Sequence, residues 1–160
     1  MDMLSFAVRT AACALALSAT PVSAHELKEQ PHGAAALHVS QDEEHGAYLV
    51  DQEGMSLYLF EADVQGSDGS EPESRCHDRC ETAWPPLLSE GKPEAHDELH
   101  PDMLGTIERE DGERQLTYNG WPLYYFSADM GPGQTRGHDI ELNGGEWYLV
   151  TPEGEGVGEE

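Results

Sequence analysis

The stretch Cys76-His77-Asp78-Arg79-Cys80 carries the most reactive side chains in the sequence. Two cysteines at this spacing can bind copper(I), which favours soft thiolate ligands, or can exchange a disulfide with another protein. In an exported chain, an even pair of cysteines is most simply a structural disulfide. The loop that such a disulfide closes is short, so we expect it to fasten one local turn. Copper binding or thiol exchange is the alternative.

Histidine offers further metal ligands, since the chain has eight. If the chain is cleaved after Ala24, His25 becomes the first residue, and its amine and imidazole form a chelating pair. In the copper alternative the ligands would be Cys76, Cys80, His77 and His25. The other histidines lack a regular ligand spacing such as His-x3-His, so we expect them on the surface. The sequence therefore predicts no resident cofactor, with copper confined to the alternative.

A short phrase occurs twice in the chain. LYLFEAD (57–63) and LYYFSAD (123–129) are identical at five of seven positions, and YLVDQEG (48–54) returns as YLVTPEG (148–154). Alternate residues of a strand point to opposite faces, so Tyr58 and Phe60 share one face, as do Tyr124 and Phe126. The other face is also apolar or aromatic in each copy. We therefore predict that both faces are at least partly covered.

Each phrase ends in an aspartate, Asp63 or Asp129, just where its strand should end. A carboxylate in that position can accept backbone N–H bonds and fix the exit turn. We interpret the aromatic residues as core and the aspartates as loop-fixing groups, in preference to a ligand site. The sequence also lacks the Gly-x-Ser-x-Gly elbow, the His-Glu-x-x-His pair, the P-loop and the dinucleotide fingerprint. We predict that the protein is not an enzyme.

The charge of the chain is strongly negative, with 32 acidic side chains against eight lysines and arginines. Nucleic acids and anionic membranes would repel such a surface, so we expect both to be poor partners and predict no binding of nucleic acid. The simplest interpretation is a solvated surface suited to a saline exterior, and the alternative is capture of cations or basic partners. An envelope protein or a small ligand remains the expected partner, and the oligomeric state is open.

Residues 1–24 resemble a secretory signal peptide. Arg9 precedes a short apolar core (10–19), Pro21 then breaks any helix, and Val22-Ser23-Ala24 has the small residues that signal peptidase accepts. The apolar run is too short to span a bilayer, and no later stretch is longer. Cys13 lies within the core and is followed by apolar residues, which does not suit a lipid-modified cysteine. We predict cleavage after Ala24 and a periplasmic or secreted protein.

The remaining chain alternates short apolar runs with turn residues. We predict a flexible arm at 25–34, one β domain at 35–152 and a disordered acidic tail at 153–160. Expected strands lie at 35–40, 47–51, 55–61 and 146–150, with one helical turn near the cysteines. The clearest signal is a three-stranded meander at 105–126, whose turns are Asp111-Gly112 and Asn119-Gly120, both preferred type I′ pairs.

Pro122 is consistent with this meander, because it falls opposite Thr117 at a position where no ladder hydrogen bond is lost. Periodicity typical of a long amphipathic helix is absent. The fold class that follows is all-β, with antiparallel hairpins in two related halves that form a small sandwich or barrel, stapled by one local disulfide.

The motifs together resemble a family of bacterial secreted or lipoprotein repeats marked by Tyr-x4-Asp, or Tyr-x-aromatic-x-x-Asp. Three further stretches match the family: Gly54-Met55-Ser56-Leu57-Tyr58, the segment Cys76-x3-Cys80-x3-Trp84-Pro85-Pro86, and Thr117-Tyr118-Asn119-Gly120-x-Pro122-Leu123-Tyr124. The match covers about residues 46–151. The resemblance implies an exported repeat module of undefined biochemical role. Many relatives are lipid-anchored, whereas the signal peptide here predicts a soluble protein.

Overall fold

The computed structural model describes residues 33–67 and 69–158. The predicted signal peptide, most of the predicted arm and the candidate ligand His25 lie outside these residues. Within them, no helix has both the length and the apolar character needed to cross a membrane.

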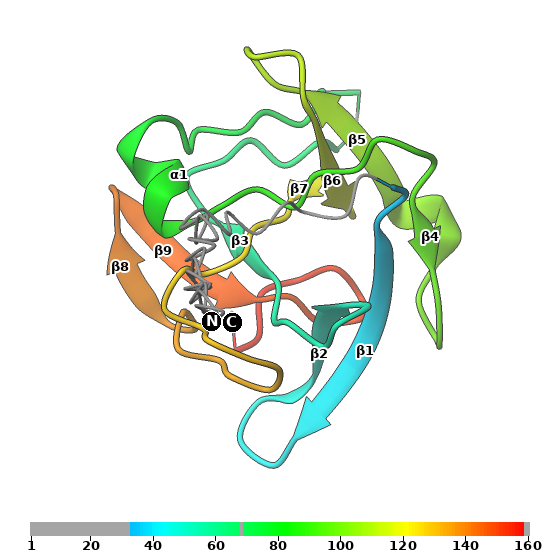
Figure 1. The fold of residues 1–160 in the computed structure, drawn as a ribbon, viewed down its shortest axis with the longest axis vertical. Helices are drawn as coiled ribbons and strands as arrows, with labels where there is room; N and C mark the ends of the chain where they lie inside the picture. Colours follow the sequence, from blue (N-terminus) through cyan, green and yellow to red (C-terminus); the bar gives the residue numbers. More distant parts are fainter. Residues whose placement is uncertain (1–32, 68, 159–160) are drawn as a thin grey trace, which may run out of the picture.

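The described residues form three small sheets of three strands each (Figure 1). The first sheet has the order β2 (Gly46–Asp51), β1 (Ala36–Asp42), β4 (Glu94–Ala95). The second has the order β3 (Tyr58–Phe60), β9 (Gly145–Leu149), β8 (Ile140–Leu142). The third has the order β5 (Leu104–Glu108), β6 (Arg114–Tyr118), β7 (Trp121–Pro122). Two short helices complete the fold, α1 (Arg79–Ala83) and the 3₁₀ helix η1 (Pro101–Met103).

The predicted all-β class is confirmed. Every pairing between strands is antiparallel except that of β1 with β4. The three sheets do not close into a barrel within the described part of the chain.

The Asn119-Gly120 turn has the predicted geometry, with φ of 48° and 78° at its two residues. It pairs Tyr118 with Trp121 and Thr117 with Pro122, the register that the proline required. The two-residue turn predicted at Asp111-Gly112 is wrong, because only Gly112 of this pair has positive φ. The β5–β6 connection is longer, since the Arg109 N–H donates to the Glu113 carbonyl at 2.8 Å.

Strand boundaries differ from the sequence prediction mainly near the second sheet. The strand predicted at 55–61 is reduced to β3, and Ser56 makes an isolated bridge to Val50. Asn143 and Gly144 both have positive φ and join β8 to β9 as a hairpin. After β9 the chain folds back, so that Gly156 bridges Val150. Residues up to 157 are therefore held by backbone hydrogen bonds, although the sequence predicts a tail from 153.

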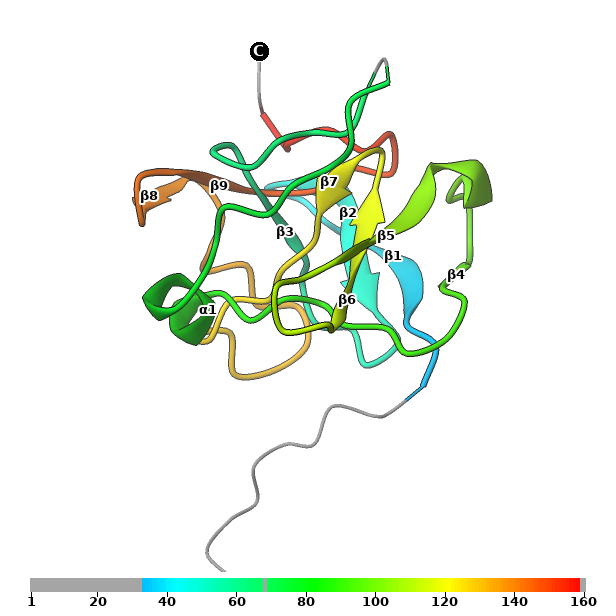
Figure 2. The same ribbon diagram turned by 90° about the horizontal axis from the view of Figure 1, so that it is seen from above.

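Two hydrophobic clusters cover the two faces of the repeated phrase, as its alternation predicted. One face contributes Leu57, Leu59 and Leu123 to an aliphatic cluster with β1, β2 and β6. The opposite face contributes Tyr58, Phe60 and Tyr124 to an aromatic cluster that also contains the two cysteines. Figure 2 shows β3 in the middle of the molecule, with α1 and β8 on one side and β1, β5 and β6 on the other.

Candidate functional site: the interlocked repeat centre

The two copies of the repeated phrase lie side by side at the centre of the fold. The Tyr58 N–H donates to the Tyr124 carbonyl at 2.9 Å, and the Tyr124 N–H donates to the Tyr58 carbonyl at 3.0 Å. This reciprocal bridge is antiparallel. The two motif tyrosines are therefore related by an approximate twofold axis that passes between them.

The side chains follow the same symmetry and cross from one copy to the other. The Tyr58 hydroxyl donates to Asp129 Oδ2 at 2.6 Å, and the Tyr124 hydroxyl donates to Asp63 Oδ2 at 2.7 Å. All four side chains belong to residues that are buried. Each tyrosine thus satisfies the aspartate that ends the other copy, and neither copy completes its own pair.

The second oxygen of each aspartate holds the loop that follows it. Asp63 Oδ1 accepts the Arg75 N–H at 2.6 Å, and Asp129 Oδ1 accepts the Arg136 N–H at 3.0 Å. The loop-fixing role expected for the aspartates is thus present in the geometry, but it is only half of what each carboxyl does. The other half, the bond to a tyrosine of the opposite copy, was not expected from the sequence.

Four aromatic rings form a continuous stack beside these pairs. The ring centroids of Phe126 and Trp84 are 4.2 Å apart, those of Trp84 and Trp147 are 3.8 Å apart, and those of Trp147 and Phe60 are 4.1 Å apart. The motif tyrosines meet the stack edge-on, with Tyr58 at 5.5 Å from Trp84 and Tyr124 at 5.2 Å from Trp147. The stack therefore repeats the twofold relation of the Tyr–Asp pairs, with the axis between the two tryptophans.

Strand pairing explains why these rings meet. In the β3–β9 pair Phe60 lies opposite Trp147. In the equivalent place of the other half, the Tyr125 N–H donates to the Pro85 carbonyl and the Ser127 N–H donates to the Ala83 carbonyl, both at 2.8 Å. These two bonds place Phe126, between Tyr125 and Ser127, beside Trp84.

A buried polar network extends from one of the two tyrosines. Ser74 Oγ lies 2.7 Å from the Tyr124 hydroxyl and accepts a bond from Arg109 Nη1 at 3.1 Å. Arg109 also donates to Gln115 Oε1 at 2.5 Å and to the Cys76 carbonyl at 3.0 Å, and it forms an ion pair with Glu81. Arg109 is only 6% exposed. Its guanidinium therefore joins the β5–β6 turn, the loop before α1 and α1 itself.

Burial sets the protonation of the centre. It raises the pKa of Asp63 to about 6, although the N–H of Arg75 and the hydroxyl of Tyr124 favour the charged form. It also raises the pKa of Asp129. Burial and the neighbouring carboxylates raise the pKa of Tyr58 and of Tyr124 far above the usual value of a phenol. Both hydroxyls are therefore protonated donors at neutral pH.

The predicted disulfide between Cys76 and Cys80 is confirmed. Both cysteines are buried in the aromatic cluster, at the start of α1. His77 Nε2 lies 2.9 Å from the Ser74 carbonyl, so this imidazole is engaged beside the network. Because copper(I) binds thiolates, the pair could take the metal only after reduction. Within the described residues, no three His, Cys, Asp or Glu side chains are grouped so that they could hold a metal ion.

Four histidines that the sequence leaves scattered form two ring pairs. His38 and His96 stack with centroids 4.6 Å apart, and His45 meets His138 edge-on at 4.8 Å. His38 also lies 3.4 Å from Asp97 Oδ2, and His96 lies 3.5 Å from Glu94 Oε2. His38 lies in β1 and His96 directly follows β4, so the first pair lies where these two neighbouring strands meet.

Sequence reasoning missed three members of the centre: Ser74, Arg109 and Gln115. Ser74 lies in a polar loop, and Arg109 lies in an acidic hairpin that looks fully solvated, so neither gives a local signal. Gln115 occupies an inward position of β6 and is fully buried. Gln115 lies opposite Ile107, so the two side chains share one face of the hairpin. This position could have indicated that the Gln115 side chain points inward.

The comparisons with known proteins match the two halves of this arrangement. A family model described as a secreted repeat of unknown function matches residues 40–88 and again residues 105–151. The first match contains Tyr58, Asp63 and Trp84, and the second contains Tyr124, Asp129 and Trp147, so both Tyr–Asp pairs join one repeat to the other. The search of the curated proteins and the search of the solved structures each found no match.

Proposed function

The chain belongs to the family of secreted repeats of unknown function, and from this premise we propose that it is a non-catalytic interaction module of the bacterial cell envelope. The observation that carries the proposal is the internal use of its reactive groups. In each Tyr–Asp pair the tyrosine of one repeat bonds to the aspartate of the other. Arg109 bonds to four partners, and the two cysteines form a disulfide.

Burial supports the same proposal. A catalytic group must reach a substrate, but the exposed fractions of Asp63, Tyr124 and Arg109 are 7%, 0% and 6%. Such groups stabilise and specify a fold when all their hydrogen bonds are made inside it. The groups that remain available to contact another molecule are then those on the surface, which supports a role in binding.

The charge limits what the surface can bind. The net charge of −24 disfavours nucleic acids and anionic lipids and favours cationic partners. The family description and the predicted signal peptide both support a place outside the cytoplasm, either in the periplasm or beyond it. We propose an exported partner of positive charge in the contact region.

Native mass spectrometry of the mature protein, purified without reductant from the periplasm, separates this proposal from a copper or thiol-redox role. The interaction module predicts an oxidised chain without metal, no reaction with thiol reagents before denaturation, and no retention of added copper(I). Copper retained in a one-to-one complex, and lost in the Cys76→Ser/Cys80→Ser variant, would support the copper role instead.

A complementation experiment separates binding from catalysis. In a strain that lacks the gene, the double variant Tyr58→Phe/Tyr124→Phe removes both central hydroxyls. The proposal predicts that this variant returns the envelope of the strain to its wild-type phenotype, provided that the variant protein is present in the same steady-state amount as the wild-type protein. Loss of function at equal amount, with a native circular dichroism spectrum, would show that the hydroxyls act in chemistry.

A further inference from the structure

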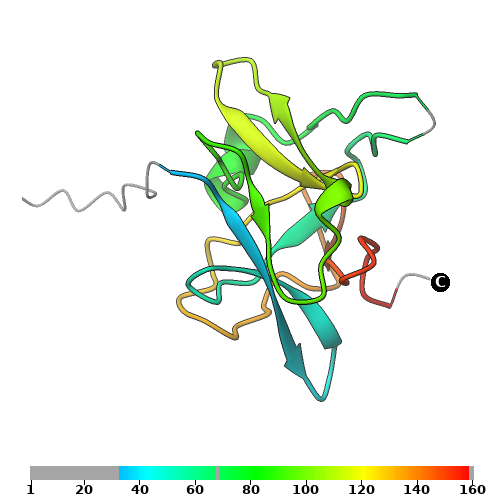
Figure 3. The same ribbon diagram turned by 90° about the vertical axis from the view of Figure 1, so that its right-hand side faces the viewer.

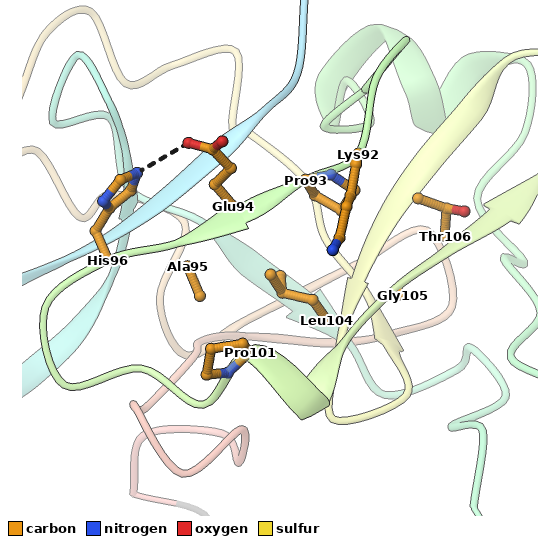
Figure 4. A pocket seen from close by; sticks show the side chains of 9 residues that line it. All are labelled: Lys92, Pro93, Glu94, Ala95, His96, Pro101, Leu104, Gly105 and Thr106. Atoms are coloured by element: carbon orange, nitrogen blue, oxygen red, sulfur yellow. Dashed lines mark ion pairs between the residues drawn. The ribbon is translucent and has the colours of Figure 1, made fainter.

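One groove in the described part of the chain lies between two open sheet edges. It has a volume of about 480 Å³ and is lined on one wall by residues 92–96 around β4 and on the other by Pro101 and residues 104–106 of β5 (Figure 4). In the three sheets β4 and β5 are both outer strands. The groove therefore separates the edge of the first sheet from the edge of the third. Figure 3 shows β4, in green, beside the first part of β1, in blue.

The edge of β4 presents unpaired backbone groups to the groove. The Glu94 N–H donates to the Ala35 carbonyl at 2.9 Å, and the His96 N–H donates to the Leu37 carbonyl at 3.0 Å. Both bonds point toward β1. Because successive residues of a strand direct their backbone groups to opposite sides, the N–H and C=O of Ala95 point away from β1 and toward the groove.

The edge of β5 does the same from the other wall. Thr106 lies opposite Leu116 in the register of β5 with β6. The Leu116 N–H, however, donates to the Leu87 carbonyl at 2.9 Å, on the far side of β6. Thr106 and Leu116 are therefore a non-hydrogen-bonded pair, and the N–H and C=O of Thr106 face away from β6, into the groove.

We propose that this groove binds an extended peptide segment of a partner protein, which adds a strand between β4 and β5. The proposal rests on the proposed function and names its site and class of partner. Strand addition uses backbone hydrogen bonds for affinity and pockets for alternate side chains for selectivity. Ala95 and Thr106 supply the backbone hydrogen bonds. The apolar side chains of Pro93, Pro101 and Leu104 supply the pockets.

Charge identifies the partner as a basic segment. Glu94 lines the groove, and Asp102 follows Pro101 on the opposite wall with its side chain exposed. Asp97 and Glu98 follow β4 and are exposed as well, but neither lines the groove, and Asp97 Oδ2 accepts the Val39 N–H at 3.1 Å. The lining also holds Lys92 and His96, and His96 Nε2 lies 3.5 Å from Glu94 Oε2 (Figure 4). The net charge of −24 adds to the attraction for a basic segment. A peptide that alternates small apolar residues, directed inward, with lysine or arginine, directed to the rim, would match both features.

The direct test is a titration of the isotope-labelled mature protein with three capped hexapeptides, followed by backbone amide NMR. The first probe is Lys-Val-Lys-Val-Lys-Val, the second has N-methyl groups on its three valines, and the third replaces lysine with glutamate. We expect saturable shifts at Ala95 and Thr106 with the first probe. The N-methylated probe should bind at least about tenfold more weakly, because each lost hydrogen bond contributes about 1 kcal/mol. The acidic probe should not bind.

Two variants with a matched control localise the effect. Glu94→Lys should weaken the basic probe about fivefold, the upper end for an exposed pair of charges. Glu141→Lys makes the same change of net charge on an exposed strand residue of β8 and should leave the affinity within about twofold. Thr106→Pro removes the free N–H without removing a bond to β6, so one carbonyl of the basic probe loses its donor and the probe should bind about fivefold more weakly.

Equal binding of the native and N-methylated probes, shifts spread over the acidic surface, or no saturable shift at Ala95 and Thr106 would each overturn the groove proposal. None of these results bears on whether the protein is a non-catalytic module, since that question is decided by the complementation experiment.

Discussion

The Tyr58 hydroxyl is bonded at 2.6 Å to Asp129, a residue 71 positions later in the chain. Tyr58 belongs to the first repeat and Asp129 to the second, and the reverse pair of Tyr124 with Asp63 has nearly the same length. A Tyr-x4-Asp motif therefore does not form a pair within itself. It forms one by exchange with a second copy, which explains why the chain contains two copies and why both are buried.

Removing one of the exchanged hydroxyls should destabilise the fold without changing it. Tyr58→Phe or Tyr124→Phe leaves a buried carboxyl without its donor, so we expect the free energy of unfolding to fall by about 1 to 3 kcal/mol for each. The control is Tyr148→Phe, whose hydroxyl bonds to Glu146 at the surface and should contribute less than about 0.5 kcal/mol. Urea unfolding followed by tryptophan fluorescence measures all three. Equal losses in all three variants would contradict the assignment.

The pH dependence of stability should report on Asp63. Burial raises its pKa to about 6 from the ordinary value of 3.8, so the folded state holds the proton more tightly than the unfolded state. The free energy of unfolding then falls as pH rises from about 4 to about 6, by an amount on the order of 2 to 3 kcal/mol, and levels off above that. Asp63→Asn should remove this part of the slope.

Urea unfolding at several pH values, in wild type and Asp63→Asn, measures the difference between the two slopes. High salt is the control, because it screens repulsion among surface carboxylates and leaves a buried group largely unaffected. A wild-type slope that disappears in high salt, or that persists unchanged in Asp63→Asn, would place its origin at the surface.

Arg109 should be the most sensitive charged residue of the fold. Arg109→Ala leaves Glu81, Gln115 and the Cys76 carbonyl without their common donor, so we expect a loss of about 3 to 5 kcal/mol in the free energy of unfolding. The control is Arg114→Ala, since Arg114 is exposed on the same hairpin and should contribute less than about 0.5 kcal/mol. Thermal unfolding followed by circular dichroism compares them, and similar midpoints for the two variants would be contrary to our account of the network.

The disulfide should contribute modestly to stability. The bond joins residues only four positions apart, so chain entropy assigns it about 2 kcal/mol. We expect Cys76→Ala/Cys80→Ala to fold with a native near-UV circular dichroism spectrum and a correspondingly lower free energy of unfolding. Failure of this variant to fold under any condition would show that the disulfide organises the aromatic cluster and does more than staple a turn.

The sequence predicted much of the architecture because its signals were local. Alternation placed Leu57 and Tyr58 on opposite faces, and the Asn119-Gly120 pair specified a turn that also had to accommodate Pro122. The prediction of a two-residue turn at Asp111-Gly112 was wrong, and the reason is also local. The Asp111 carboxylate accepts the Glu113 N–H at 2.9 Å, which stabilises a longer turn that needs positive φ at Gly112 alone.

The centre could be predicted only in part because its contacts are long-range. That Tyr58 and Asp63 are buried follows from their positions, but their exchange of partners depends on how two distant segments pair. The burial of Arg109 depends on a hairpin that folds over α1, and the acidic residues around Arg109 in the sequence do not predict this contact. The sequence nevertheless places two tyrosine hydroxyls and two aspartate carboxylates in buried positions, and each of them needs a hydrogen-bond partner. Pairing between the two copies could have been predicted from that need.

Fragment complementation tests the central claim, that the repeats fold only together. The mature chain is divided after Asp97, in the connection between the two matched segments, and each fragment is studied by near-UV circular dichroism alone and in an equimolar mixture. We predict that neither fragment shows the signal of packed tryptophans alone, since Trp84 and Trp147 belong to different fragments, and that the mixture recovers the native spectrum. A native-like, cooperatively unfolding spectrum from either fragment by itself would contradict the account.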